Sequence, residues 1–203
     1  MKSTDKNLIK ESVRISGSVV LATVNPSLIP AWELSLAVLG AVIDRRNDKA
    51  QEWLNLFVDN KEKFSDAVIN NPSFQDAFVN SFELYLRERN KEKRLVMKSI
   101  FVDFSKSQNL EEYPLEKYYF VLNTISIRSL RLLSHLRQRS EEKDYFQVEN
   151  NSFPEFEQTS ELINELLTLN ILTSNPNARW GPVENPSVRF SVFGKEFIQF
   201  IKE

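Results

Sequence analysis

Apolar residues recur every three to four positions along most of this chain, and that spacing predicts a mainly helical protein. The clearest stripe holds Phe74, Phe78, Phe82 and Leu86 at four-residue steps. Such a stripe covers one side of a helix and must pack against a partner helix. The chain uses 15 Phe and only 4 Gly, so we expect an aromatic core between helices.

The most apolar stretch, residues 13–43, is interrupted by Pro26 and Pro30. A membrane-spanning helix needs about 20 consecutive apolar residues, and neither half of the stretch reaches that length. We therefore predict an apolar helical hairpin over residues 15–43, buried in a core or in an oligomer interface. A second interpretation, in which residues 13–43 contact a membrane, stays open.

The pattern of apolar and polar residues changes in the C-terminal third of the chain. Residues 141–154 are polar and acidic and are interpreted as a linker between a helical domain, residues 1–140, and a small unit, residues 155–203. In that unit a helical pattern is followed by Pro- and Gly-containing turns, the alternating strand "VRFSV" and an aromatic closing helix for which Ser191 is the expected cap. Helix, short β-hairpin, helix is the order of a winged-helix-like unit.

The amino-acid composition excludes several kinds of functional site. With 0 Cys there are no disulfides or thiolate sites, and the scattered glycines form no phosphate-binding loop. The single histidine, His135, has Arg131 and Arg139 one helical turn away on either side and no carboxylate at that spacing. We predict no enzyme, no cofactor and no metal site. We read no signal peptide at the start, so we expect a cytoplasmic protein, peripheral to a membrane if residues 13–43 contact one.

The charges are segregated along the chain, although the net charge is only -2. Residues 86–139 carry twelve basic and six acidic side chains, whereas residues 141–203 carry five basic and eleven acidic ones. The helix that would enter a DNA groove has Glu161 and Glu165 and no base, which disfavours nucleic acid as a partner of this unit. We predict a protein partner or a second copy of the chain. The candidate contacts with a partner or a phosphate are Arg128, Arg131, His135, Arg179, Trp180 and Arg189.

The order of these segments resembles that of bacterial helical proteins similar to the abortive-infection, Abi-alpha type. The likeness runs from the interrupted apolar segment through "DRRNDKAQEWLNLF", "SFQDAFVNSFELYLRERNKEKRLVMKSIF" and "FVLNTISIRSLRLLSHL" to "FSVFGKEFIQFI". The resemblance implies a helical body with a winged-helix-like C-terminus, a role in phage defence and no catalytic residues. The predicted function is a non-enzymatic helical protein-interaction module in bacterial antiphage defence. The alternatives are a membrane-associating effector acting through residues 13–43 and a winged-helix DNA-binding regulator.

Overall fold

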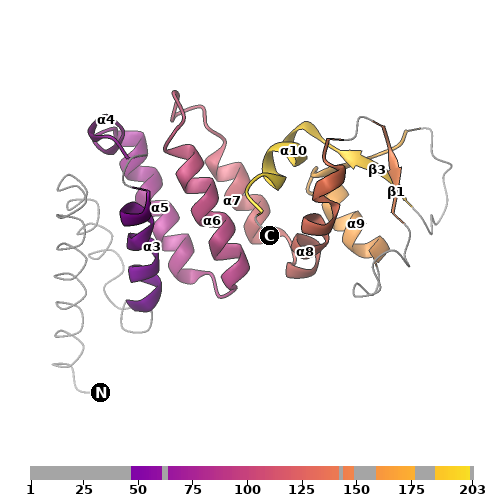
Figure 1. Ribbon diagram of the computed structural model, residues 1–203, viewed down its shortest axis with the longest axis horizontal. Coiled ribbons are helices and arrows are strands. Elements are labelled where there is room, and N and C mark those ends of the chain that lie inside the picture. The colour runs from indigo at the N-terminus through magenta and orange to yellow at the C-terminus, as the bar shows by residue number, and fades with distance from the viewer. Residues whose placement is uncertain (1–46, 61–63, 142–143, 149–158, 177–185, 202–203) are drawn as a thin grey trace, which may run out of the picture. The chain divides into compact units, whose positions relative to one another are not determined.

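The computed structural model describes residues 47–60, 64–141, 144–148, 159–176 and 186–201. It is mainly helical, with a small three-stranded antiparallel sheet near the C-terminus, so the predicted fold class is confirmed (Figure 1). The chain divides into two compact units, an N-terminal unit of residues 1–115 and a C-terminal unit of residues 116–203. The hairpin predicted over residues 15–43 lies outside the described residues.

The N-terminal unit is built from helices whose ends are set by local side chains. Asn71 and Asn90 each accept a hydrogen bond from a backbone N–H of the first turn that follows, at 2.8 Å and 3.1 Å. Amide side chains favour this position because they satisfy donors that a helix leaves unpaired. The helices are α3 (Asn47–Asp59), α4 (Asp66–Ile69), α5 (Pro72–Arg87) and α6 (Lys91–Phe104).

Aromatic rings fill the core of this unit. The predicted stripe on α5 is confirmed, because Phe74, Phe78, Phe82 and Leu86 are all fully buried. Phe101 of α6 lies at the centre of the ring cluster. Its ring centroid lies between 5.1 and 6.4 Å from those of Trp53, Phe64, Phe74, Phe78 and Phe104.

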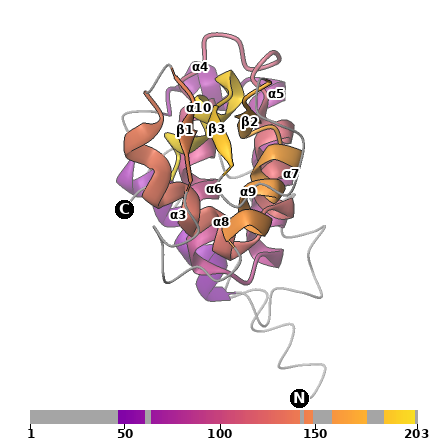
Figure 2. The same ribbon diagram turned by 90° about the vertical axis from the view of Figure 1, so that its right-hand side faces the viewer.

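The C-terminal unit combines helices with the small sheet. The strands are β1 (Phe146–Gln147), β2 (Leu172–Ser174) and β3 (Ser187–Phe190), and β3 lies in the middle, antiparallel to both neighbours (Figure 2). The helices are α7 (Leu115–Thr124), α8 (Ile127–Leu136), the short 3-10 helix η4 (Arg137–Arg139), α9 (Thr159–Thr168) and α10 (Val192–Ile198). Helix, β2–β3 hairpin and helix follow one another as expected from the sequence.

Two features of this unit differ from the sequence interpretation. Strand β1 falls inside residues 141–154, which we had interpreted as a linker. Phe146 and Val148 are buried on either side of exposed Gln147, and this short alternation is hidden in the sequence by its acidic neighbours. In addition, α8 packs against α9, so a helix assigned to residues 1–140 belongs to the C-terminal unit.

Backbone hydrogen bonds hold the residues that follow α9 against the start of α10; this contact is the joint between α9 and α10. Asn170 has a φ of 55°, and the N–H of Ile171 donates to the carbonyl of Leu166 at 2.9 Å, which closes the helix end. The N–H of Ser191 donates to the carbonyl of Ile171 at 3.0 Å, and the Ser191 side chain caps α10 by accepting from the N–H of Gly194. The expected cap at Ser191 is therefore confirmed.

Within the described ranges, none of the helices is long and apolar enough to cross a membrane.

Candidate functional site

Helix α8 presents a basic face to solvent. Its leucines point inward, and Leu130, Leu132, Leu133 and Leu136 are nearly fully buried. Three of the predicted contact residues, at spacings of three and four, are exposed on the other side of the helix. They are Arg128, Arg131 and His135. No acidic residue occurs between Ile127 and Leu136, so the helix itself contributes no negative side chain to this face.

The basic character continues past the end of α8. Arg139 is exposed, and its guanidinium carbon lies 4.6 Å from the centroid of the Phe146 ring. Its Nη1 also donates to the backbone carbonyl of Gln147 at 3.4 Å. Arg137, by contrast, donates to the carbonyl of Ile201 at 2.9 Å and serves to hold the end of the described chain. Arg139 therefore extends the basic surface while it covers the edge of β1.

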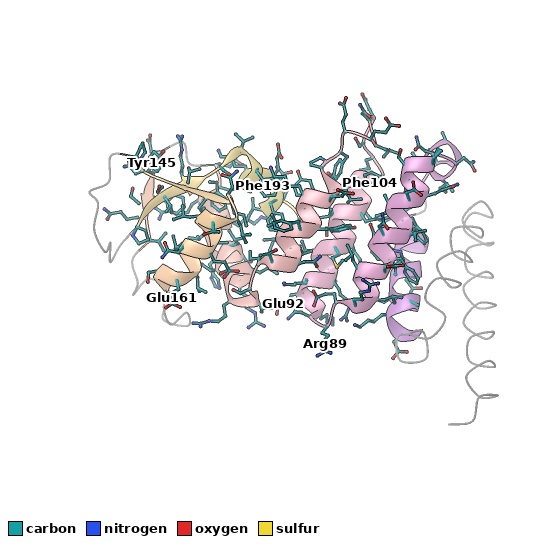
Figure 3. The ribbon with its side chains drawn as sticks, turned by 180° about the vertical axis from the view of Figure 1, so that it is seen from behind. Arg89, Glu92, Phe104, Tyr145, Glu161 and Phe193 are labelled. Carbon is teal, nitrogen blue, oxygen red and sulfur yellow. The ribbon has the colours of Figure 1, made fainter. Side chains whose placement is uncertain are left out.

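The remaining candidates are not on this helix. Arg189 is exposed on β3, with its guanidinium carbon 4.7 Å from the ring centroid of Tyr145, which Figure 3 labels. A stacked guanidinium of this kind is held in place by its aromatic neighbour while its donors stay accessible. Arg179 and Trp180 lie outside the described residues.

Glu165 caps the start of α8, a role that the sequence does not indicate. Its carboxylate accepts one hydrogen bond from the N–H of Ser126 and another, at 2.6 Å, from the hydroxyl of Ser129. A negative charge at the N-terminus of a helix is stabilising, so Glu165 of α9 holds the first turn of α8. Of the two acids counted against nucleic acid on this helix, only Glu161 is exposed (Figure 3).

The charge balance of the C-terminal unit also changes with its boundary. Residues 116–203 carry ten basic and twelve acidic side chains, a difference of two, because α7 and α8 bring basic residues with them. The strongly acidic unit inferred from residues 141–203 followed from a boundary placed after α8. With the boundary at residue 116, the C-terminal unit has a nearly balanced charge and carries a basic helix face.

Replacing Glu165 with Gln is expected to destabilise the C-terminal unit by about 1–3 kcal/mol. With its amide oxygen on Ser126 N–H, glutamine would present its NH₂ to the Ser129 hydroxyl, which can turn to accept, but the charge-assisted hydrogen bonds and the negative charge at the start of α8 would be lost. Urea unfolding followed by circular dichroism measures the effect. Glu161→Gln, an exposed change on the same helix, is the matched control and is expected to shift stability by less than about 0.5 kcal/mol. Equal stability of the two variants would contradict this role of Glu165.

The N-terminal unit holds a charged cluster that sequence reasoning missed. The Glu52 carboxylate of α3 lies 3.4 Å from Arg94 Nε and 3.3 Å from Lys98 Nζ, both on α6. The ring of Tyr85, on α5, lies beneath the two cations, with its centroid 5.8 Å from the Arg94 guanidinium carbon and 5.7 Å from Lys98 Nζ. Arg94 and Lys98 lie 42 and 46 residues from Glu52 in sequence and Tyr85 lies 33 residues away, so no local pattern marks them.

The pKa values of Tyr85 and Glu52 in this cluster are shifted in opposite directions. Burial raises the pKa of Tyr85, and the nearby Glu52 carboxylate raises it further. Burial also tends to raise the pKa of Glu52, but interactions with Tyr85, Lys98 and Arg94 outweigh it, so that pKa is lowered. The stability contributed by ionised Glu52 is thus present above the usual carboxyl pKa and is lost as the pH falls through the lowered value.

Among the residues that the structure describes, no group of three or more His, Cys, Asp or Glu side chains could hold a metal ion. No protein-family model, no curated protein and no solved structure matches the chain. The resemblance to the Abi-alpha type, drawn from the sequence, therefore stays a prediction.

Proposed function

We propose that this protein is a non-enzymatic interaction module that binds an acidic partner through the basic face of α8. The observation that carries the proposal is the exposed row of Arg128, Arg131 and His135 on a helix that has no acidic residue. Long-range attraction between such a face and a carboxylate-rich surface speeds association and sets orientation. The buried leucines hold the helix rigidly, so the row keeps its spacing.

A protein partner is favoured over duplex DNA by the surroundings of this face. In a winged-helix reader the groove is entered by the helix that corresponds to α9, and α9 exposes Glu161 and carries no basic residue. Glu141 and Asp144, both exposed, come two and five residues after Arg139. A phosphate backbone that followed the basic row would meet these acids, whereas a short acidic segment of a protein fits within the length of α8.

Reversing the charge of two residues in this row tests the proposal. We expect Arg128→Glu with Arg131→Glu to weaken binding of a fluorescently labelled, glutamate-rich peptide at least tenfold, because two attractions become repulsions and about 1.4 kcal/mol corresponds to a factor of ten. Fluorescence anisotropy at low and moderate salt gives the affinity and its salt dependence. Lys91→Glu with Lys106→Glu is the matched control, since both lysines are exposed and the change in net charge is the same.

Three outcomes separate the candidate functions. Loss of peptide binding in the α8 variant alone supports the proposal. Equal loss in both double variants means that binding follows net charge, and overturns it. Binding of a short duplex DNA in preference to the peptide would instead favour the DNA-binding regulator.

A role in antiphage defence rests on the sequence resemblance, as does the bacterial setting. The plating efficiency of phages on bacteria with and without the protein tests that role independently of the partner. The membrane-associating alternative depends on residues 13–43, which lie outside the described residues, and it stays a prediction.

A further inference from the structure

Three donor groups meet the two carboxylate oxygens in the cluster around Glu52. Arg94 and Lys98 bring two positive charges to one carboxylate, and the hydroxyl of Tyr85 is a third donor group beside it. Tyr85 is 0 % exposed, and its hydroxyl lies beside the Glu52 carboxylate and the Arg94 guanidinium without a hydrogen bond of good geometry to either. Arg94 Nε is likewise buried, and its contact with the Glu52 carboxylate, at 3.4 Å, is an ion pair without good hydrogen-bond geometry.

Such an arrangement is unfavourable as a purely structural network. A buried donor without an acceptor costs about 1–3 kcal/mol, and native proteins rarely keep one without a reason. Among the ion pairs of the described residues, both cations share the single carboxylate of Glu52. Trp53, next to Glu52 in sequence, adds a further buried N–H without an acceptor, and its ring centroid lies 5.0 Å from that of Tyr85.

The donors are of the kind that bind oxyanions. A guanidinium, an ammonium and a phenol hydroxyl supply the charge and the directed hydrogen bonds that a phosphate group requires. Arg94 and Lys98 stand four residues apart on α6, and the Glu52 carboxylate lies between their cationic groups as an anion would. The Glu52 side chain is 30 % exposed, so it can move toward solvent while the buried tyrosine stays in place.

We propose that Arg94, Lys98 and Tyr85 form a binding site for a phosphate group, and that Glu52 occupies the position of the anion until the ligand displaces it. A phosphate group has more acceptor oxygens than a carboxylate and can reach the Tyr85 hydroxyl and Arg94 Nε together. The site lies in the N-terminal unit and is separate from the basic face of α8.

Glu52→Gln tests the site because it removes the competing charge and keeps the shape of the side chain. We expect this variant to bind inorganic phosphate at least tenfold more tightly than the unchanged protein. Phosphate is titrated against the fluorescence of Trp53, with Trp32→Phe and Trp180→Phe removing the other two tryptophans, and potassium chloride at equal ionic strength serves as the reference. Glu83→Gln is the matched control, since Glu83 pairs with Arg87 on the surface of α5, and it is expected to leave the phosphate affinity unchanged.

A second variant keeps the test decisive if Glu52→Gln does not fold. Lys98→Gln retains Glu52 and is expected to lose most of the phosphate-dependent rise in melting temperature. If neither variant changes the phosphate response, the cluster is a structural ion-pair network and the proposal is wrong. If the variants do change the phosphate response, titration with a soluble phosphate monoester and with vesicles that carry phosphate headgroups identifies the source of the ligand. Specific binding of either one supports the site.

Discussion

Replacing Gly194 with Ala is expected to unfold or severely loosen the joint between α9 and α10. A Cβ atom at this position would lie 1.9 Å from the carbonyl oxygen of Ile171 and 2.8 Å from its carbonyl carbon. Both atoms belong to the backbone, so the clash cannot be relieved by a side-chain rotation. The same carbonyl accepts the hydrogen bond from Ser191 N–H, and moving α10 away would break that bond as well. We expect a loss of at least about 3 kcal/mol, at the upper end of the range for overpacked sites.

Hydrogen exchange locates this effect within the chain. Amides of β3 and α10 should exchange much faster in the Gly194→Ala variant, whereas those of α6 in the N-terminal unit should keep their protection. Val192→Ala is the control, because Val192 is 79 % exposed two residues away and its truncation removes no close packing. Unchanged exchange in α10 of the Gly194→Ala variant would show that this close approach is not needed.

Phe101→Ala should have an effect of similar size on the N-terminal unit. The Phe101 ring is fully buried and lies within 6.4 Å, centroid to centroid, of five other aromatic rings. Four of these rings come from α3, α5 and α6, and the fifth belongs to Phe64, two residues before α4. Truncating such a ring typically costs about 3–5 kcal/mol, because the lost burial is added to the cost of the cavity. Urea unfolding followed by Trp53 fluorescence reports on this core, since the two ring centroids are 5.1 Å apart.

Leu95→Ala provides the comparison for the core variant. Leu95 lies on the same helix, α6, but is 49 % exposed, and its truncation is expected to cost less than about 1 kcal/mol. A Phe101→Ala variant that unfolds at the same urea concentration as Leu95→Ala would contradict the central position of this ring in the core.

Much of the secondary structure could be predicted from the sequence because it depends on local patterns. The four-residue steps from Phe74 to Leu86 are sufficient to define one buried helix face, and Ser191 is a recognisable cap for the last helix. The partner of that last helix was harder to predict. Phe193, Phe197 and Phe200 all place their rings against Tyr118 of α7, at centroid distances of 5.4, 6.4 and 5.1 Å, and no local pattern in the sequence marks that partner.

The candidate sites also differ in how well the sequence predicts them. The exposed row on α8 follows from spacing along one helix, so Arg128, Arg131 and His135 could be chosen from the sequence. The capping of α8 by Glu165 joins residues 36 and 39 positions apart, and the Glu52–Lys98 contact joins residues 46 apart. Contacts between residues so far apart in sequence depend on how the helices pack, and charge counting along the chain could not show that Glu165 caps α8.

The strand order of the small sheet has a consequence for how the protein is made. Strand β3 pairs with both β1 and β2, yet it is the last of the three to be synthesised. While the chain leaves the ribosome, Phe146, Val148 and Leu172 have no strand to pair with until residues 187–190 follow. The helices of the N-terminal unit, which rely on contacts closer in sequence, can form earlier. In a nascent C-terminal unit, β1 therefore waits for about 40 further residues before its partner strand is made, and β2 waits for about 13.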